Sequence, residues 1–384
     1  MTNLGRRAVV GLVAACLVFG SCESDGQTAK EESPTAPSTT ATTSPPPLTP
    51  VVPPGFNAAS VTFVSQTKGW VLGSATCGAA PCVQVWRTGD GGRTWAAVPA
   101  PPVPVPLEVG VENPPLIRFA NTDDGWISAD GKLWATHDGG AHWNEQSVKP
   151  VRALEASAGS VHAVVTANGQ ESFAFTVLTS PVDRDAWRPA EATVSHGAGP
   201  VPRAQLVLHG RSGWMVIVNR AIVGGLRLQN GRWVNWKPPC DGQGTPLEFA
   251  ASTASDLVAF CTDGIWNDRP PGDRVFVSTD GGSSFRQVPS ASPVRNVYAV
   301  AAATPDVWVA GSTETNAEGQ RQAVLLRTTD AGRIWTTVHR AGESNWLELG
   351  MTTAQQGVVI DEGEIDKLFM TYDGGQTWTP VEPH

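Results

Sequence analysis

Thr371–Trp378 reads TYDGGQTW, and the same pattern occurs four more times along the chain. Each copy has Ser or Thr, any residue, Asp, Gly or Ala, Gly, two variable positions and an aromatic residue. The other copies are Thr88–Trp95 (TGDGGRTW), Thr136–Trp143 (THDGGAHW), Ser278–Phe285 (STDGGSSF) and Thr328–Trp335 (TTDAGRIW). A phrase that returns in this way is typical of a chain built from copies of one supersecondary unit.

The spacing of the copies indicates the size and number of the units. Their aspartates are 48, 142, 50 and 43 residues apart. The long gap has room for two further units, and weak copies lie near the expected places, at Ser180–Trp187 and at the Asn230-Gly231 turn. Seven units of roughly 43 to 50 residues result, the length that a four-stranded propeller blade needs. We therefore predict an all-β fold, a single seven-bladed β-propeller of four-stranded antiparallel blades.

Residues 116–146 show one unit most plainly. Leu116–Ala120 is apolar enough for an inner strand, and Trp126–Ser128 starts a second strand after a turn. Ala129-Asp130-Gly131 is a hairpin turn. Lys132–Thr136 is then the third strand and His142–Gln146 the short outer strand, so the repeated phrase forms the hairpin between the last two strands.

The phrase has a physical explanation as a rigid corner. The Asp carboxylate can accept hydrogen bonds from N–H groups of the loop, Gly supplies positive φ, and the aromatic side chain packs beside the hairpin. The residues predicted to have this structural role are Asp90, Trp95, Asp138, Trp143, Asp280, Phe285, Asp330, Trp335, Asp373 and Trp378.

The phrase resembles the Asp box of the BNR repeat family. A Gly-Trp pair at the second strand, as in Gly69-Trp70, combined with TxDGGxxW resembles most closely the photosystem-assembly-factor-type (Ycf48-like) propellers. The resemblance extends from about residue 56 to residue 383 and is strong in five units. It implies seven blades with Asp-box hairpins.

The first 22 residues predict a lipoprotein signal peptide. Arg6-Arg7 precedes the apolar run Ala8–Val18, and the segment FGSC that ends at Cys22 resembles a bacterial lipobox, so Cys22 would become the acylated N-terminus. Cys16, in VAAC, is a competing lipobox with a shorter apolar run, and cleavage without lipidation is a third alternative. The predicted location is extracytoplasmic, anchored to the bacterial cell membrane by lipid, with Sec and twin-arginine export both open.

Residues 23–54 predict a tether, and residues 55–384 the propeller. The first segment is rich in Ser, Thr and Pro, with too little apolar area to offset the entropy of ordering. Leu48–Val52 could still add a strand to the ring, although the last blade has four strands of its own.

Four cysteines remain in the propeller, in a chain predicted to reach a compartment where disulfides persist. Three connectivities are possible, and we expect nearest neighbours to pair, Cys77 with Cys82 and Cys240 with Cys261. Neither spacing is that of a zinc or redox motif.

Several classes of function are disfavoured by the sequence. A net charge of −9 argues against generic nucleic-acid binding. No catalytic or metal-binding motif appears, so we expect no cofactor, no metal and no catalytic residue. Sialidases and xyloglucanases also contain Asp boxes, but this chain has only two tyrosines, no Arg-Ile-Pro motif and length for a single propeller.

Recognition is expected on the face opposite the Asp boxes, where the loops vary most. Three neighbouring units have long or charged loops there, at Thr262–Arg274, Ser312–Gln322 and Asp361–Lys367. Trp266 is a candidate contact anchor or, alternatively, a cap of its own loop. The candidate partner-binding residues around it are Asp263, Asp268 and Arg269. The acidic residues of the third loop lack EF-hand spacing, which favours solvated charge over a cation site.

Four arginines near the starts of inner strands are the second candidate group: Arg118, Arg152, Arg203 and Arg295. They could form a basic patch for an anionic segment of a partner, or Glu248 and Glu348 could neutralise them.

The sequence thus predicts a monomeric, non-catalytic scaffold or assembly factor that binds an envelope or membrane protein. The alternative is a carbohydrate-active protein that binds or cleaves a glycan.

Overall fold

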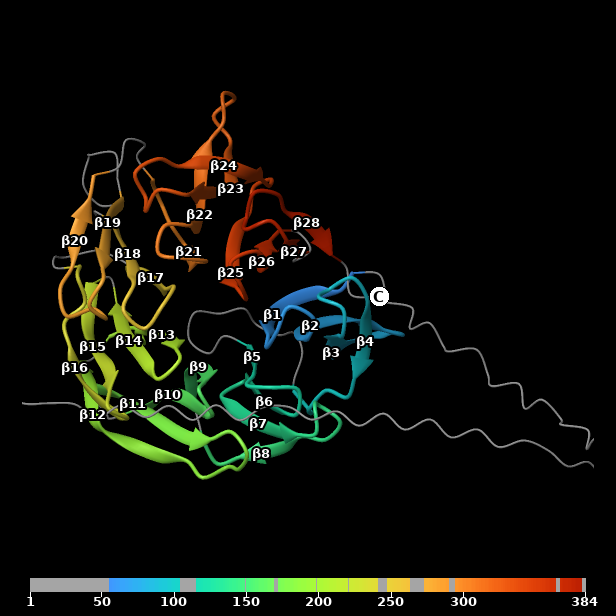
Figure 1. The fold of residues 1–384 in the computed structure, drawn as a ribbon. Coiled ribbons are helices and arrows are strands. Elements are labelled where there is room, and N and C mark those ends of the chain that lie inside the picture. The colour runs from blue at the N-terminus through green and yellow to red at the C-terminus, as the bar shows by residue number, and fades with distance from the viewer. Residues whose placement is uncertain are drawn as a thin grey trace, which may run out of the picture. The chain divides into compact units, whose positions relative to one another are not determined.

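The computed structural model describes residues 55–103, 115–148, 150–168, 172–197, 199–219, 221–240, 247–262, 273–289, 294–363 and 367–381. They form 28 β-strands in seven four-stranded antiparallel sheets, arranged as blades around a ring (Figure 1). Each blade consists of four consecutive strands, numbered first to fourth from the centre outwards. The predicted seven-bladed, all-β propeller is confirmed. Cys22, the tether and Leu48–Val52 lie outside the described residues.

The first four blades, I to IV, cover residues 57–236. Blade I has β1 (Asn57–Phe63), β2 (Gly69–Cys77), β3 (Ala80–Thr88) and β4 (Trp95–Val98); blade II has β5 (Leu116–Phe119), β6 (Asp124–Ala129), β7 (Lys132–His137) and β8 (Asn144–Gln146). Blade III has β9 (Val151–Ser157), β10 (Ser160–Asn168), β11 (Ser172–Pro181) and β12 (Arg188–Gly197); blade IV has β13 (Arg203–His209), β14 (Ser212–Asn219), β15 (Ala221–Gln229) and β16 (Arg232–Trp236).

Blades V to VII cover residues 247–381. Blade V has β17 (Leu247–Ala251), β18 (Leu257–Thr262), β19 (Asp273–Ser278) and β20 (Arg286–Val288); blade VI has β21 (Ala299–Ala302), β22 (Trp308–Thr315), β23 (Arg321–Thr328) and β24 (Thr336–Arg340); blade VII has β25 (Asn345–Met351), β26 (Gly357–Glu362), β27 (Lys367–Thr371) and β28 (Thr379–Val381). No helix occurs in these ranges, so the described chain offers no helical membrane span.

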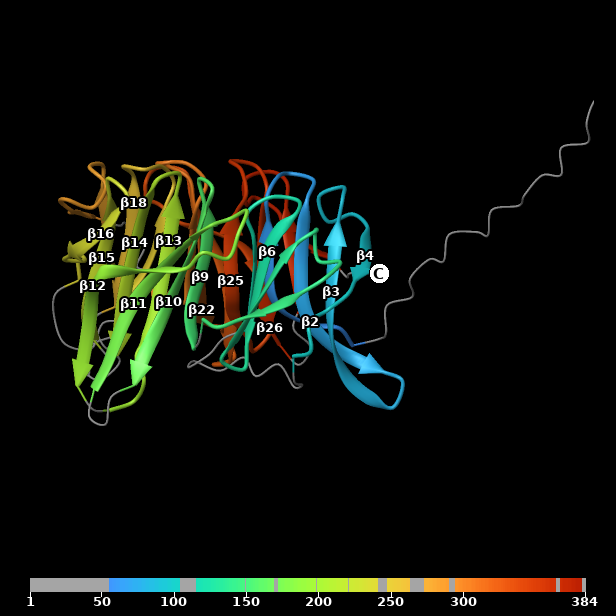
Figure 2. The same cartoon turned by 90° about the horizontal axis from the view of Figure 1, so that it is seen from below.

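The strands run from one face of the ring to the other (Figure 2). Since neighbouring strands are antiparallel, the turns after each first and third strand lie on one face, which we call the Asp-box face. The connections after each second and fourth strand lie on the opposite face.

The hydrophobic core lies between blades rather than within them. Buried apolar side chains form seven clusters, and each combines residues of two neighbouring blades. At the junction of blades I and II, for example, Trp70 stacks on Phe119 with ring centroids 3.8 Å apart. Gly125, paired with Phe119, makes room for that ring, because a Cβ there would lie 2.5 Å from it. The Gly-Trp pairs of the sequence therefore reflect packing between blades.

The Asp box of blade V shows how the corner is held. The Ser278 hydroxyl donates to Asp280 Oδ1 (2.8 Å) and accepts from the Gly282 amide (2.8 Å). The amide and hydroxyl of Ser284 donate to Asp280 Oδ1 (2.9 Å) and Oδ2 (2.6 Å). These bonds, led by that from the Ser284 hydroxyl, lower the pKa of Asp280 to about 2. The same turn needs positive φ at two successive residues, including Ala331 with φ 58° in blade VI.

Four of the five Asp boxes also bind the preceding blade through one backbone carbonyl. This carbonyl belongs to the first of the two small residues of the box. The amide of the same residue donates to a carbonyl of its own blade, as the Gly91 amide does to Thr67 O (2.9 Å). We call this bond to the preceding blade the inter-blade latch. The latches are Trp70 Nε1 to Gly139 O (3.4 Å), Trp214 Nε1 to Gly281 O (2.9 Å), Arg327 Nε to Gly374 O (2.7 Å) and Tyr372 Oη to Gly91 O (2.8 Å).

The last of these latches joins blade VII to blade I and so closes the ring. Here no strand is exchanged between sheets within the described ranges. On the channel side, the Glu348 carboxylate accepts hydrogen bonds from the Ser60 hydroxyl (3.0 Å) and the Val61 amide (2.8 Å). Closure therefore depends on side-chain contacts and on the apolar cluster between the two blades.

We expect Tyr372→Phe to lower the free energy of unfolding by about 1 kcal/mol, because the Gly91 carbonyl loses its hydrogen bond from the neighbouring blade. Urea denaturation followed by tryptophan fluorescence measures this change. Tyr298→Phe is the matched control, since Tyr298 is equally exposed (41% against 40%) and makes a longer, 3.3 Å bond to Arg321. Equal destabilisation by both variants would contradict the role of Tyr372 in closure.

Candidate functional site in the central channel

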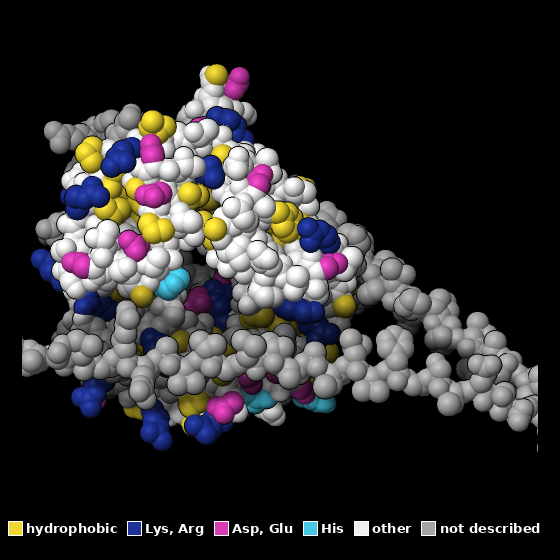
Figure 3. Space-filling view, viewed as in Figure 1, with side chains coloured by type: hydrophobic (Ala, Val, Ile, Leu, Met, Phe, Trp, Pro, Cys, Tyr) yellow, Lys and Arg dark blue, Asp and Glu magenta, His cyan; other side chains and the backbone are white. Residues whose placement is uncertain are grey.

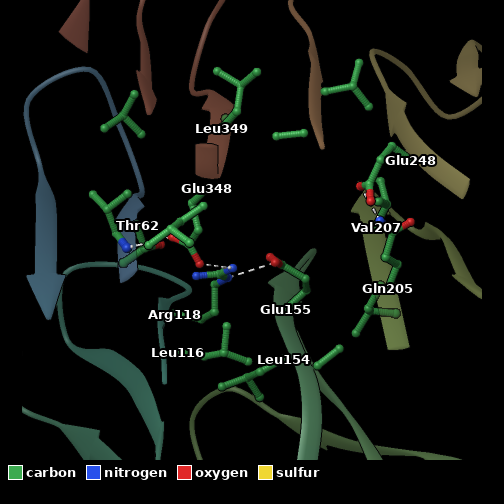
Figure 4. A pocket seen from close by; sticks show the side chains of 18 of the residues that line it. Thr62, Leu116, Arg118, Leu154, Glu155, Gln205, Val207, Glu248, Glu348 and Leu349 are labelled. Carbon is green, nitrogen blue, oxygen red and sulfur yellow. Dashed lines mark hydrogen bonds and ion pairs between the residues drawn. The ribbon is translucent and has the colours of Figure 1, made fainter. Parts of the chain in front are cut away.

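A cavity of about 680 Å³ occupies the centre of the ring, and the first strands of all seven blades line it (Figure 4). Most of its wall is apolar, with Leu116, Leu154 and Leu349 among the lining residues. Charged side chains enter it from β5, β9, β13, β17 and β25. The channel is therefore the place where functional groups from different blades come together.

Arg118 lies between two carboxylates. Its Nε donates to Glu155 Oε1 (2.8 Å) and its Nη2 to Glu348 Oε1 (3.1 Å), so one guanidinium connects β5, β9 and β25. Burial opposes charge on Arg118, but the attraction of Glu155 and Glu348 outweighs it and raises the arginine's pKa. Burial also raises the pKa of Glu155, partly offset by Arg118. Arg118 thus stays charged, and its charge is balanced within the channel by Glu155 and Glu348.

A second ion pair crosses from β13 to β17. Arg203 pairs with Glu248, and the Gln205 amide donates to the other carboxylate oxygen. Glu248 is 8% exposed, and burial raises its pKa despite the nearby arginine. The sequence left open whether the arginines form a basic patch or are neutralised by Glu248 and Glu348. In the structure Arg118 pairs with Glu348 and also with Glu155, and Arg203 pairs with Glu248.

The other two predicted arginines are placed differently. Arg152 lines the channel but is 6% exposed, and its Nε donates to the Thr166 hydroxyl (3.1 Å). Arg295 precedes β21, is exposed on the opposite face and is not part of the channel lining. The structure thus brings together three of the four arginines, in a channel where carboxylates accompany them.

The channel opens on the opposite face beside a small polar network, which we call the channel mouth: Tyr298, Arg321, Asn345 and Glu362. Arg321 lies over the Tyr298 ring, 5.7 Å from its centroid, and donates to Asn345 Oδ1 (2.6 Å). Asn345 donates in turn to Glu362 Oε2 (3.1 Å). Tyr298 is 41% exposed. Arg321 and Glu362 lie in two of the variable loops in which the sequence predicts recognition. Tyr298 lies outside those loops, and no sequence motif pointed to it.

The other predicted contact residues belong to the segment between β18 and β19. Trp266, Asp263, Asp268 and Arg269 lie in residues 263–272, outside the described ranges. Of the acidic loop, Asp361 is buried at the end of β26, and residues 364–366 are also outside. No three His, Cys, Asp or Glu side chains gather as a metal-binding group in the part of the chain described.

Both expected disulfides are present. Cys77–Cys82 closes the β2–β3 hairpin, and Cys240–Cys261 links the segment after β16 to β18 of the next blade, with Cα atoms 5.7 and 5.5 Å apart. The second therefore adds a covalent link between blades IV and V.

Replacing Arg118 by Met should destabilise the fold by about 2 to 3 kcal/mol at neutral pH, since Glu155 and Glu348 would face each other without a counter-charge. Thermal and urea denaturation measure this effect. Arg340→Met is the control, because its pair with Glu314 is largely exposed and should contribute less than about 1 kcal/mol. A similar, small change in both variants would show that the channel pair is not structural.

No protein-family model and no curated protein matches the chain. Similar solved structures include Ycf48 bound to a D1 peptide (16% identity, TM-score 0.56, 84% of this chain and 95% of that one) and Ycf48 from Cyanidioschyzon merolae (15%, 0.56, 85% and 97%). A PL25 ulvan lyase is also similar (10%, 0.56, 85% and 96%). At such identities the likeness shows the fold alone: the chain is a seven-bladed propeller like those of Ycf48, and this architecture also occurs in an enzyme.

Proposed function

We propose that this protein is a lipid-anchored, extracytoplasmic propeller that binds a protein partner at the cell envelope, as a scaffold or assembly factor and without catalysis. The observation that carries the proposal is the channel mouth. Tyr298 presents an exposed aromatic ring held by Arg321, and Tyr and Arg are enriched among the residues that dominate protein–protein affinity. On the same face β18 ends and β19 begins, and the sequence between them contains Trp266.

The chemistry of the channel supports binding over hydrolysis. Each of Glu155, Glu248 and Glu348 has an arginine partner, whereas a glycoside hydrolase needs one carboxyl group as an acid and a second as base or nucleophile. The solved complex of Ycf48 with a D1 peptide further supports a protein ligand for a propeller of this fold.

A carbohydrate-active function is the second candidate, and the pKa values of two channel carboxyls favour it. Burial raises the pKa of both Glu155 and Glu248, which is the direction required of a general acid. Release of reducing sugar from envelope glycans by the wild-type protein, lost in Glu248→Gln, would support this candidate against ours.

Binding at the channel mouth predicts that Tyr298→Ala combined with Arg321→Ala will reduce recovery of the partner about tenfold or more in co-purification from membranes. Ile334→Ala, an exposed residue (59%) on the Asp-box face, is the control and should leave recovery unchanged. Trp266→Ala with Arg269→Ala tests the neighbouring loop in the same way. Unchanged recovery with both double variants would reject this face as the binding site.

Lipid anchoring predicts that Cys22→Ser will move the protein from the detergent phase to the aqueous phase on phase partitioning, because the acylated cysteine would be lost. Cys16→Ser is the matched control and should still partition with detergent. A Cys22→Ser protein that stays in the detergent phase would exclude this anchor.

A further inference from the structure

Blades III and IV lack Asp boxes, and the Asp-box face is hollowed there. In blade III the Ser180 hydroxyl organises the turn by accepting from the Ala186 amide (2.8 Å). In blade IV the turn Asn230-Gly231, with φ of 50° and 77°, joins β15 directly to β16. A cleft of about 1340 Å³ extends across these blades to the Asp box of blade V. It is distinct from the channel.

Four arginines line this cleft: Arg188, Arg211, Arg227 and Arg232. None of them forms an ion pair within the described ranges, unlike Arg118 and Arg203 in the channel. Lys and Arg side chains are visible along the lower-left edge of the ring in Figure 3, where Figure 1 labels β12 and β16. In a chain of net charge −9, four arginines around one cleft, none in an ion pair in the described ranges, form a local cationic surface.

Arg227 is fixed in place by uncharged groups. Its Nη1 donates to the Gly281 carbonyl (2.8 Å) and to the Ser283 hydroxyl (2.8 Å) of blade V. These acceptors orient the guanidinium without cancelling its charge. Two carboxylates also line the cleft, Asp280, which stays ionised because its pKa is lowered, and the exposed Glu191. The four arginines therefore leave this lining with an excess of positive charge.

The floor of the cleft adds a neutral donor. His162 is 5% exposed, and burial lowers its pKa to about 4, so the ring is uncharged at neutral pH. Its Nδ1 accepts from the Trp233 indole (3.4 Å) and lies 2.9 Å from the Thr179 hydroxyl. The proton of the neutral ring is therefore on Nε2, which makes no hydrogen bond within the described residues and is available to an acceptor in the cleft.

From this lining we infer that the cleft binds an anionic polysaccharide, one whose carboxylate, sulfate or phosphate groups pair with the guanidinium groups. Arginine matches such oxyanions with two parallel N–H bonds. The remaining polar lining, Ser157, Ser160, Ser212 and Asn230, suits sugar hydroxyls.

A peptide ligand fits this lining less well than a carbohydrate. Peptide and protein interfaces obtain most of their affinity from exposed aromatic anchors and the pockets that they fill. Both tryptophans at the cleft are buried, Trp214 at 1% and Trp233 at 6% exposure, so the described lining offers charged and hydroxyl-matching polar groups rather than an exposed tryptophan anchor. This site and the channel mouth lie on opposite faces, so each proposal can fail without the other.

Titration calorimetry with the purified full chain tests the inference, using dextran sulfate and polygalacturonate as probes and neutral dextran and polyglutamate as comparisons. We expect both anionic polysaccharides to bind in about 50 mM salt and to bind more weakly as salt increases. Arg211→Glu with Arg232→Glu should weaken binding about tenfold or more. Lys68→Glu with Arg333→Glu, an equal charge change at exposed positions of blades I and VI outside the cleft lining, should have little effect.

Three outcomes would overturn the inference. Absence of binding to both anionic polysaccharides would exclude the ligand class, and equal weakening by the two double variants would show that binding follows overall charge rather than the cleft. Polyglutamate binding as tightly as polygalacturonate would assign the cleft to acidic peptides instead. Circular dichroism and thermal denaturation of both double variants verify that they are folded.

Discussion

One backbone carbonyl in each Asp box explains why the phrase is repeated. The box holds its own turn through the Asp and Ser or Thr side chains, and in four of five copies it also accepts a hydrogen bond from the preceding blade. That carbonyl is presented only if two successive residues adopt positive φ, which explains the small residues at these positions. At four of the seven junctions between blades, the phrase therefore helps to set the position of one blade relative to its neighbour, in addition to shaping a corner.

The structure shows what replaces the latch where the phrase is missing. Between blades II and III, Asp185 accepts from the Gln146 amide (2.8 Å), and between blades III and IV the Trp233 indole donates to His162. These contacts maintain the ring without building the protruding box. The two units with weak repeats, blades III and IV, thus correspond to the cleft on the Asp-box face.

The sequence predicted the architecture well because its determinants are local. Asp-Gly-Gly turns, Gly-Trp pairs and unit length each depend on a few neighbouring residues, and the second unit was placed almost strand for strand at Leu116–Gln146. Pairing between blades depends on residues far apart in sequence. Glu155 gave no sign of its contact with Arg118, because only the packing of blade II against blade III brings the two together. Arg211 and Arg232 gave no sign of their common cleft, because they lie at separate hairpin turns of blade IV. The short separation within each cysteine pair, by contrast, made the disulfides predictable.

The ring is closed by Tyr372, Glu348 and an apolar cluster, while each sheet consists of consecutive strands. In the described chain, no sheet contains a strand from another blade. The chain termini could therefore lie at any junction between blades without dividing a sheet. Circular permutants that join β28 to β1 and begin at another blade would therefore preserve every sheet. Such permutants would change the orientation of the channel mouth and of the arginine cleft relative to the two ends of the chain.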